Sequence, residues 1–209
     1  MEENSVDKIY HYLLNMILNG ELKPGDKIAE ETYAELFSVS RTPIREVFRR
    51  LAANGLITIY PRRFAQVSPI EEKDLQDLGL LRIAIEDMAI RLAIYKGSQE
   101  EYDALMEIAE QCLDAGKQKN EKQRFSLDRK FHRYLIELSR NKELLNVYED
   151  LDLKIQYILI NHPESEKNSI RNLEEHIELV KMIEEGDSKK AVQIAEQHLS
   201  SFYGIKLVF

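Results

Sequence analysis

The sequence predicts a mainly α-helical protein, in which an N-terminal winged helix-turn-helix with a small β-hairpin wing precedes an all-α bundle of six helices. Three observations support this fold class. The chain of 209 residues has only eight Gly and five Pro, which is typical of a helix-rich globular protein. Strand signals fall in one short segment, residues 56–67, and from Glu71 onward none is seen before the last few residues. From Glu71 onward, apolar residues recur at helical spacing.

Three helices and a hairpin are predicted before Pro69, where we place the boundary between a domain of residues 1–69 and one of residues 70–209. Helical spacing of apolar residues, with Gly, Pro and Ser beside it, places helices at residues 5–19, 30–37 and 42–54. Two strands, residues 56–60 and 64–67, alternate apolar and polar positions. The second helix is expected to bury four apolar side chains, those of Tyr33, Ala34, Leu36 and Phe37.

Six helices are predicted after Pro69, punctuated by Gly, Asn and Pro residues. They span residues 71–96, 99–117, 120–139, 141–161, 167–186 and 188–204. The apolar tail, residues 205–209, follows no pattern that assigns it to an element. The single cysteine, Cys112, cannot form an internal disulfide, and we expect a thiol in the core.

Charge is distributed unevenly along the chain. The net charge is -8, but residues 1–69 carry nine Lys or Arg and nine Asp or Glu, so the excess acidity lies in the second domain. Between Ser38 and Val67 there are six Arg and a single acidic residue, Glu46. A local cluster of positive charge, rather than the total, determines whether a surface attracts nucleic acid. The sequence therefore predicts a DNA-binding face in the first domain.

The helix that begins near Thr42 carries this charge on one face. Its apolar residues follow the spacing of a buried stripe, whereas Arg41, Arg45 and Arg49 recur every four residues along another face. A guanidinium can donate two hydrogen bonds to guanine or hold a phosphate, so Arg41 and Arg45 are predicted to read bases. Thr42 adds a donor for phosphate, and Arg49 and Arg50 are expected to contact the backbone or pair with carboxylates. The alternative is a solvated basic face without a ligand.

One carboxylate and three imidazoles have spacings that bring them together in the second domain. Asp128 and His132 are four residues apart and share a helix face. His176 lies ten residues before Gly186 and His198 eleven residues after Asp187, so both reach the same height in an antiparallel helical hairpin. This donor set predicts a divalent metal ion, zinc first, with nickel, cobalt, copper or manganese as alternatives. Taken singly, each histidine would more simply be an ordinary surface or core residue, as we expect for His11 and His162, and the joint register of the other three favours the metal site.

The N-terminal segments Leu36-Phe37-Ser38-Val39-Ser40-Arg41-Thr42-Pro43-Ile44-Arg45-Glu46 and Leu51-Ala52-Ala53-Asn54-Gly55-Leu56-Ile57 resemble the winged helix-turn-helix of GntR-type bacterial repressors. The resemblance covers residues 5–69. It implies that Arg41, Thr42 and Arg45 contact operator DNA and that the wing tip, with Arg62 and Arg63, enters the minor groove. The family usually has Gly where this chain has Phe64, and a side chain there limits how closely the backbone approaches DNA.

Residues 70–209 resemble the six-helix effector-binding FCD domain of the FadR-like branch of that family. Metal-binding members carry Asp-x-x-x-His, seen here in Leu127-Asp128-Arg129-Lys130-Phe131-His132, and further histidines in Glu175-His176-Ile177 and Glu196-Gln197-His198-Leu199. Leu81-Arg82-Ile83-Ala84-Ile85-Glu86 resembles the first helix of the domain, which implies that Arg82 lines the effector cavity. Ser139-Arg140-Asn141 stands where the family commonly has Ser-Gly-Asn.

We therefore expect a cytoplasmic transcription regulator, most simply a repressor, and not an enzyme. Its partners would be double-stranded operator DNA with a palindromic site, a second copy of the chain in a homodimer, and a small carboxylate effector held at the metal and neutralised by Arg82. The acidic N-terminus lacks the features of a secretory signal, and no apolar run reaches the roughly 20 residues that span a membrane.

Three other interpretations stay open at this point. The metal could itself be the signal. A metal-dependent hydrolase would use an ion with an open position to activate water, although the sequence has no His-Glu-x-x-His motif. A metal-free acyl-chain sensor is the third, and the register of the histidines argues against it.

Overall fold

The computed structural model describes residues 4–61, 64–161 and 166–206. They divide into two compact units. The first unit contains residues 1–71 together with 150–163, and the second contains residues 72–149 together with 164–209. Within the described ranges, no helix combines the length and the apolar composition needed to cross a membrane. The predicted division into one domain of residues 1–69 and another of residues 70–209 stays a prediction.

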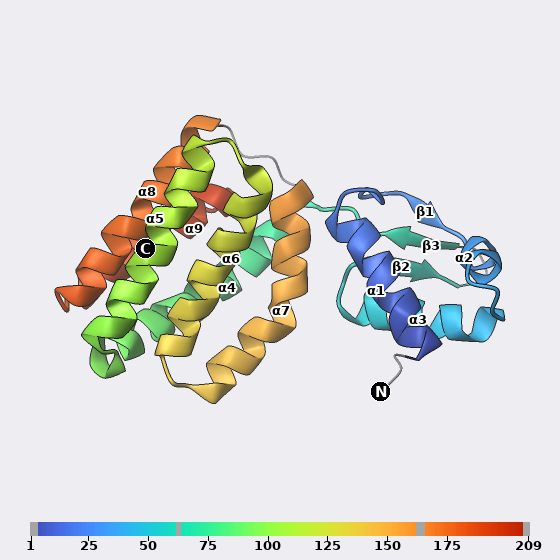
Figure 1. The fold of residues 1–209 in the computed structure, drawn as a ribbon, viewed down its shortest axis with the longest axis horizontal. Helices are drawn as coiled ribbons and strands as arrows, with labels where there is room; N and C mark the ends of the chain where they lie inside the picture. Colours follow the sequence, from blue (N-terminus) through green and yellow to red (C-terminus); the bar gives the residue numbers. More distant parts are fainter. Residues whose placement is uncertain (1–3, 62–63, 162–165, 207–209) are drawn as a thin grey trace. The chain divides into compact units, whose positions relative to one another are not determined.

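The first unit is built on three short helices, α1 (Ser5–Leu18), α2 (Glu30–Leu36) and α3 (Arg41–Ala53) (Figure 1). Helix α1 begins where the side chain of Asn4 accepts a hydrogen bond from the amide of Asp7. The apolar stripes of α1 and α3 face a common core. Their fully buried members include Ile9, Leu13, Ile17, Ile44, Val47 and Leu51. The predicted helix-turn-helix is therefore present, with each boundary within one residue of the prediction.

Helix α2 corrects one prediction about burial. Tyr33 and Ala34 are buried as expected, but the side chain of Leu36 is 58% exposed. At about 100° per residue, Tyr33, Ala34 and Phe37 point to one side of the helix, whereas Leu36 points well away from that direction. The expectation followed from apolar character alone and neglected this angular position.

A three-stranded antiparallel sheet completes the first unit, in the order β1-β3-β2. The hairpin strands β2 (Ile57–Tyr60) and β3 (Phe64–Val67) are the predicted wing, with Tyr60 opposite Phe64. The third strand, β1 (Lys27–Ile28), was not predicted. It has only two residues, too few to show alternation, and it forms because Ile28 is buried opposite Ala65.

The remaining six helices are α4 (Glu72–Lys96), α5 (Gln99–Lys117), α6 (Glu121–Leu138), α7 (Lys142–Asn161), α8 (Glu166–Glu184) and α9 (Ser188–Tyr203). They match the six predicted helices to within two residues. Ser98 and Glu101 form a reciprocal capping box at the start of α5, and the side chain of Asp187 caps α9. Residues 150–161 of α7 count with the first unit, where Tyr157 is buried in the core and its hydroxyl donates to the carbonyl of Ser68.

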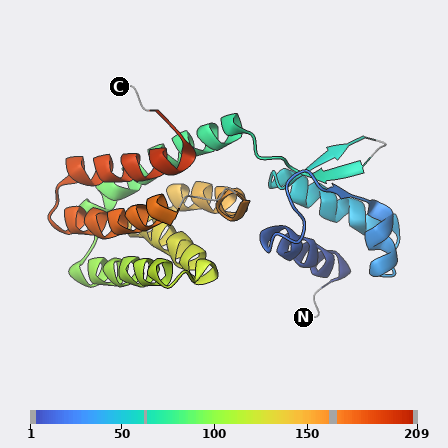
Figure 2. The same ribbon diagram turned by 90° about the horizontal axis from the view of Figure 1, so that it is seen from above.

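The second unit is a helical bundle, in which α8 packs against α5 and α9, as Figure 2 shows, and α4 packs against α6 and α9. Its core includes Ile90, Ala109, Leu135, Val180 and Ala195, one from each of these five helices. Helices α4 and α9 approach each other closely at Gly79, where an added Cβ would lie 2.6 Å from Tyr203. This close approach brings the end of α9 beside Arg82, one turn further along α4.

Candidate functional site

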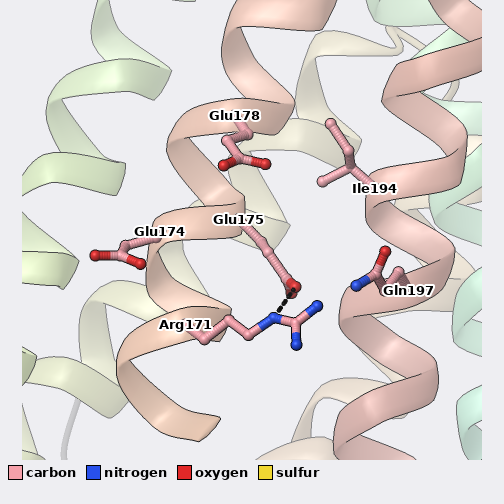
Figure 3. A pocket seen from close by; sticks show the side chains of 6 residues that line it. All are labelled: Arg171, Glu174, Glu175, Glu178, Ile194 and Gln197. Carbon is pink, nitrogen blue, oxygen red and sulfur yellow. Dashed lines mark hydrogen bonds and ion pairs between the residues drawn. The ribbon is translucent and has the colours of Figure 1, made fainter. Parts of the chain in front are cut away.

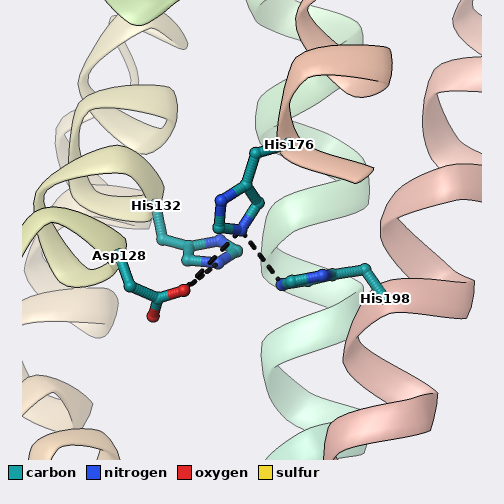
Figure 4. Close-up of side chains that lie close together, drawn as sticks. All are labelled: Asp128, His132, His176 and His198. Carbon is teal, nitrogen blue, oxygen red and sulfur yellow. Dashed lines mark hydrogen bonds and ion pairs between the residues drawn. The ribbon is translucent and has the colours of Figure 1, made fainter. Parts of the chain in front are cut away.

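The structure brings together the four side chains that the sequence predicts as metal ligands (Figure 4). Asp128 and His132 lie one turn apart on α6, His176 projects from α8, and His198 projects from α9. All four are buried, and one donor atom from each lies within 4.8 Å of every other. Their convergence follows from helical spacing on α6 and from the matched register of the α8–α9 hairpin. Their role as ligands stays a prediction.

The donor atoms are spaced as neighbours around one ion would be. Asp128 Oδ1 lies 3.7 Å from His176 Nε2 and 3.9 Å from His132 Nε2. The two Nε2 atoms of His176 and His198 are 3.2 Å apart. First-row divalent ions bind nitrogen and oxygen donors at about 2.0 to 2.2 Å, so adjacent donors stand roughly 3 to 3.5 Å apart. The separation between His176 and His198 already falls in this range, and the two Asp128 distances exceed it by a few tenths of an ångström.

The surroundings of His132 and His176 favour the neutral form of each imidazole. Burial lowers the pKa of His132, and the positive charge of Arg82 lowers it further against the opposing effect of Glu86. For His176, burial and then the neighbouring His198 and His132 hold the pKa well below its ordinary value. A metal-binding histidine must offer a nitrogen lone pair, so the neutral form is the one that can coordinate.

Arg82 lies beside this cluster with its guanidinium buried. Its Nε donates to Glu86 Oε1 at 2.7 Å, and its Nη1 donates to the hydroxyl of Tyr203 at 3.2 Å. Burial alone would lower the pKa of Arg82, but the carboxylate of Glu86 raises it well above its ordinary value, so the group stays charged. The remaining nitrogen, Nη2, has no hydrogen-bond partner within the described part of the chain. A buried cation with an unused donor can accept an anionic ligand.

Two carboxylates beside the histidines were not predicted. Glu86 Oε2 lies 2.8 Å from His132 Nδ1, and Glu175 Oε2 lies 3.4 Å from His198 Nδ1. A signal for Glu86 was available, because it falls within the apolar stripe of α4, between Ile83 and Ile90, where a lone carboxylate requires a partner. Glu175 gave no comparable signal, since charged residues are frequent along α8.

Glu175 also lines a surface pocket of about 170 Å³ between α8 and α9 (Figure 3). The other lining residues are Arg171, Glu174, Glu178, Ile194 and Gln197. Arg171 donates from Nε to Glu175 Oε1 at 3.3 Å. The carboxylate of Glu175 therefore separates the pocket from His198.

The basic face of α3 is exposed, as the sequence predicts. The side chains of Arg41 and Arg45 are 55% and 57% exposed, and Thr42 and Arg49 are also exposed. Each of the first two is engaged by a carboxylate at the start of α2, because Arg41 pairs with Glu31 and Arg45 with Glu30. These two pairs were not predicted.

Other residues near this face have separate roles. Arg50 pairs with Asp7 and lies over the ring of Tyr10, in agreement with a carboxylate partner. Ser40 precedes α3, but its side chain makes no capping hydrogen bond, so the first amides of the helix keep their donors available. Phe64 contacts Tyr60, and Lys27 lies over its ring. Arg62 and Arg63 at the predicted wing tip lie outside the described residues, as does His162, whereas His11 is exposed on α1.

A groove of about 600 Å³ runs between α3 and the sheet of the first unit. Its walls carry Arg41, Arg45 and Arg49 on one side and Tyr60 and Phe64 on the other. Two acidic residues, Glu30 and Glu31, also line it. The predicted base-reading arginines therefore open onto a concave surface of mixed charge.

A winged helix-turn-helix with a basic recognition helix, followed by an all-helical domain, is the architecture of a DNA-binding transcriptional regulator. Residues 5–67 match the bacterial regulatory proteins of the gntR family, and residues 77–201 match the FCD domain. The chain belongs to the GntR family of bacterial transcriptional regulators and carries an FCD domain. The expected fold class and family are thereby confirmed.

Similar proteins agree with this assignment. The chain is 32% identical to the HTH-type transcriptional regulator YdhC of Bacillus subtilis strain 168, over 94% of this chain and 86% of that protein. It is 27% identical to the transcriptional repressor RspR of Escherichia coli K12, over 92% of this chain and 84% of that protein. Its fold resembles the metal-free FCD domain of TM0439, with a TM-score of 0.54 and 24% identity, over 66% of this chain and 94% of that domain.

Proposed function

We propose that this regulator is a repressor whose affinity for operator DNA is set by a small carboxylate bound at a divalent metal ion in the second unit. The observation that carries the proposal is the convergence of one carboxylate and three imidazole nitrogens beside the buried charge of Arg82. In this proposal the four metal ligands and Arg82 serve to bind the effector, and we assign no catalytic residue. As a DNA-binding protein it would work in the cytoplasm.

The balance of buried charge supports a cation at this position. Among the buried charged side chains that face the histidines or Arg82, the carboxylates of Glu86, Asp128 and Glu175 outnumber the one guanidinium, that of Arg82. Leaving an uncompensated charge in a protein interior is costly. When bound, a divalent ion would supply positive charge and open coordination positions for an anion. Asp128, His132, His176 and His198 would hold it, and zinc suits this donor set best, with nickel, manganese, cobalt and copper as alternatives.

Arg82 would fix the carboxylate. Its free Nη2 donor is available to a second oxygen of the ligand, and its charge acts on both His132 and His176, which places it within electrostatic range of the centre. A guanidinium suits a carboxylate because it can donate parallel hydrogen bonds. A ligand with more than one carboxylate would also suit the site, because the bound metal ion would add positive charge to that of Arg82.

In the first unit, Arg41 and Arg45 would read bases in the major groove, while Thr42 and Arg49 would hold phosphates together with the free amides at the start of α3. Arg62 and Arg63 are proposed to contact the minor groove on the basis of the family resemblance. A homodimer would present two such faces to a palindromic operator. Effector binding would change operator affinity by about 5-fold to 150-fold, the usual range of coupling between two sites.

The proposal is tested with the purified full-length chain and a fluorescent duplex from the region upstream of its own gene. Operator affinity is measured by anisotropy after chelation, after addition of zinc, and with zinc plus a panel of mono-, di- and tricarboxylates. We expect an effect of at least one acid that disappears in the chelated protein and in Arg82→Ala. A change with zinc alone would make the metal the signal, and an operator affinity that never changes would leave a constitutive DNA binder.

A further inference from the structure

Two of the three histidines at the centre are backed by a carboxylate on the side away from it. His132 Nδ1 faces Glu86 Oε2 at 2.8 Å, and both side chains are about 1% exposed. His198 Nδ1 faces Glu175 Oε2 at 3.4 Å. The other nitrogen, Nε2, lies 3.9 Å from Asp128 Oδ1 in His132 and 3.2 Å from His176 Nε2 in His198, on the side of the shared centre. The two imidazoles are therefore held between a carboxylate and the position of the proposed ion.

A carboxylate at Nδ1 determines which nitrogen of the ring can bind a metal. An ionised carboxylate only accepts hydrogen bonds, so it favours a proton on Nδ1 and leaves the lone pair on Nε2. The same contact fixes the rotation of the ring and makes Nε2 a better electron donor. For His132 the contact already has hydrogen-bond length. For His198 it exceeds that length by a few tenths of an ångström, which a small side-chain rotation would close.

The two carboxylates are held with different firmness. Glu86 is fixed by Arg82, whose Nε donates to Oε1 while His132 faces Oε2, so both oxygens are engaged in the interior. Glu175 instead sits at the base of the surface pocket, where its partner Arg171 is 65% exposed (Figure 3). We therefore expect the contact of Glu86 with His132 to be stronger than that of Glu175 with His198.

The third histidine is oriented by another means. The ring of His176 stacks on Phe131 with the centroids 4.2 Å apart and the planes at 22°. Its Nδ1 has no hydrogen-bond partner among the residues that the structure describes. Stacking fixes the plane of the ring, and no carboxylate faces its Nδ1 among the described residues, so His176 provides an internal contrast to the other two.

We propose that Glu86 and Glu175 are positioning residues, which orient His132 and His198 and direct their Nε2 atoms to the metal. This inference rests on the proposed metal site. It means that tight metal binding needs these two carboxylates in addition to the four ligands. Loss of either carboxylate should weaken metal binding although neither side chain touches the ion.

The test measures zinc affinity by competition with a chromophoric chelator in the full-length protein. We expect Glu86→Gln to raise the dissociation constant by about 10-fold to 100-fold and Glu175→Gln by about 10-fold. Glu174→Gln and Glu178→Gln are matched controls, because they remove the same charge from the same pocket without facing a histidine, and they should stay close to wild type. With cobalt in place of zinc, the visible absorption bands should shift in the first two variants and not in the controls.

A second measurement needs no variant and no metal. In ¹⁵N-histidine-labelled protein treated with chelator, we expect His132 and His198 to carry their proton on Nδ1. A proton on Nε2 of His132, or variants of Glu86 and Glu175 with wild-type zinc affinity and cobalt spectra, would overturn the inference and leave the metal site in place. Wild-type protein that binds neither zinc nor cobalt would overturn the proposed site itself.

Discussion

Among single residues, Cys112 shows how burial decides chemical behaviour. It is fully buried on α5 with Leu113 and Leu173, and its Sγ donates weakly to the carbonyl of Arg124. Burial, followed by the charge of Asp128, raises the pKa of the thiol far above neutrality, so the reactive thiolate is suppressed. We predict negligible alkylation of the native protein by iodoacetamide and complete alkylation in urea. Native alkylation at the rate of a free thiol would contradict this burial.

The histidine ligands lead to a prediction about metal removal. With His176→Ala, a nitrogen donor is lost from the centre of the cluster, and we expect the purified variant to retain no zinc by elemental analysis. A ligand that binds only the folded state stabilises it, so chelation should lower the melting temperature of wild type but not of the variant. His11→Ala, which changes an exposed residue on α1, is the control. Zinc retained by the His176 variant would exclude it as a ligand.

The donors themselves could be predicted because helical geometry relates spacing to position. Asp128 and His132 had to share a face of α6, and the hairpin fixed the relative heights of His176 and His198. The groups behind them could not be predicted in the same way. Which carboxylate meets which imidazole depends on the rotation of α4 against α6 and of α8 against α9, and spacing within one helix carries no information about that rotation.

Among the secondary-structure elements, the start of α2 acts directly on the basic face of α3. Glu30 and Glu31 occupy the guanidinium groups that we propose for base reading, so DNA must displace these carboxylates. We predict that Glu31→Gln binds operator about 2-fold to 5-fold more tightly at low salt, an effect that shrinks as salt rises. Arg41→Ala should weaken binding by about 1 to 3 kcal/mol.

Glu35→Gln provides the control for that experiment, because it removes the same charge from an exposed position of α2 that does not face these arginines. Anisotropy titrations at several salt concentrations provide the measurement. Equal gains from the Glu31 and Glu35 variants would mean that only the overall charge matters, and the specific pairing with Arg41 would have no effect on DNA binding.

At the contact between α4 and α9, we expect replacement of a glycine by alanine to destabilise the protein, which is the opposite of its usual effect in a helix. Alanine normally stabilises a helix interior by about 1 kcal/mol relative to glycine. At Gly79, however, the added Cβ would lie 2.6 Å from atoms of both Tyr203 and Ile205. We expect Gly79→Ala to destabilise the protein by about 1 to 3 kcal/mol in urea unfolding, as overpacking does. Ala84→Gly, on the exposed face of α4, should cost only the ordinary 1 kcal/mol or so. A more stable Gly79 variant would contradict this close packing.

Secondary-structure elements could be predicted where many apolar residues recur with one helical period. The long helices α4 to α9 each carry several turns of apolar repeat, and Gly or Asn residues near their ends limit the error. Strand β1 has no such repeat, and its existence depends on the exposed edge of β3, which is a tertiary feature. The second half of α7 packs into the first unit through Tyr157, and no local pattern indicates which core a helical residue joins.

At the scale of the whole molecule, α4 is apolar on more than its buried face. Leu80, Leu81, Met88 and Tyr95 recur at helical spacing and are 43% to 85% exposed. Solvent exposure of such a stripe is unfavourable, and contiguous apolar surface commonly marks an interface. We propose that a second copy of the chain covers it in the dimer that a palindromic operator would require.

This proposal predicts that a charge placed in the stripe produces monomers. Burying an unpaired carboxylate at an interface costs several kcal/mol, so Met88→Glu should shift the mass found by light scattering from two chains to one. Val147→Glu is the matched control, because Val147 is 43% exposed on α7 and lies outside the stripe. The Met88 variant should also lose operator affinity, since each chain would then bind one half-site alone. A dimer that persists with Met88→Glu and dissociates with Val147→Glu would place the interface on α7 instead.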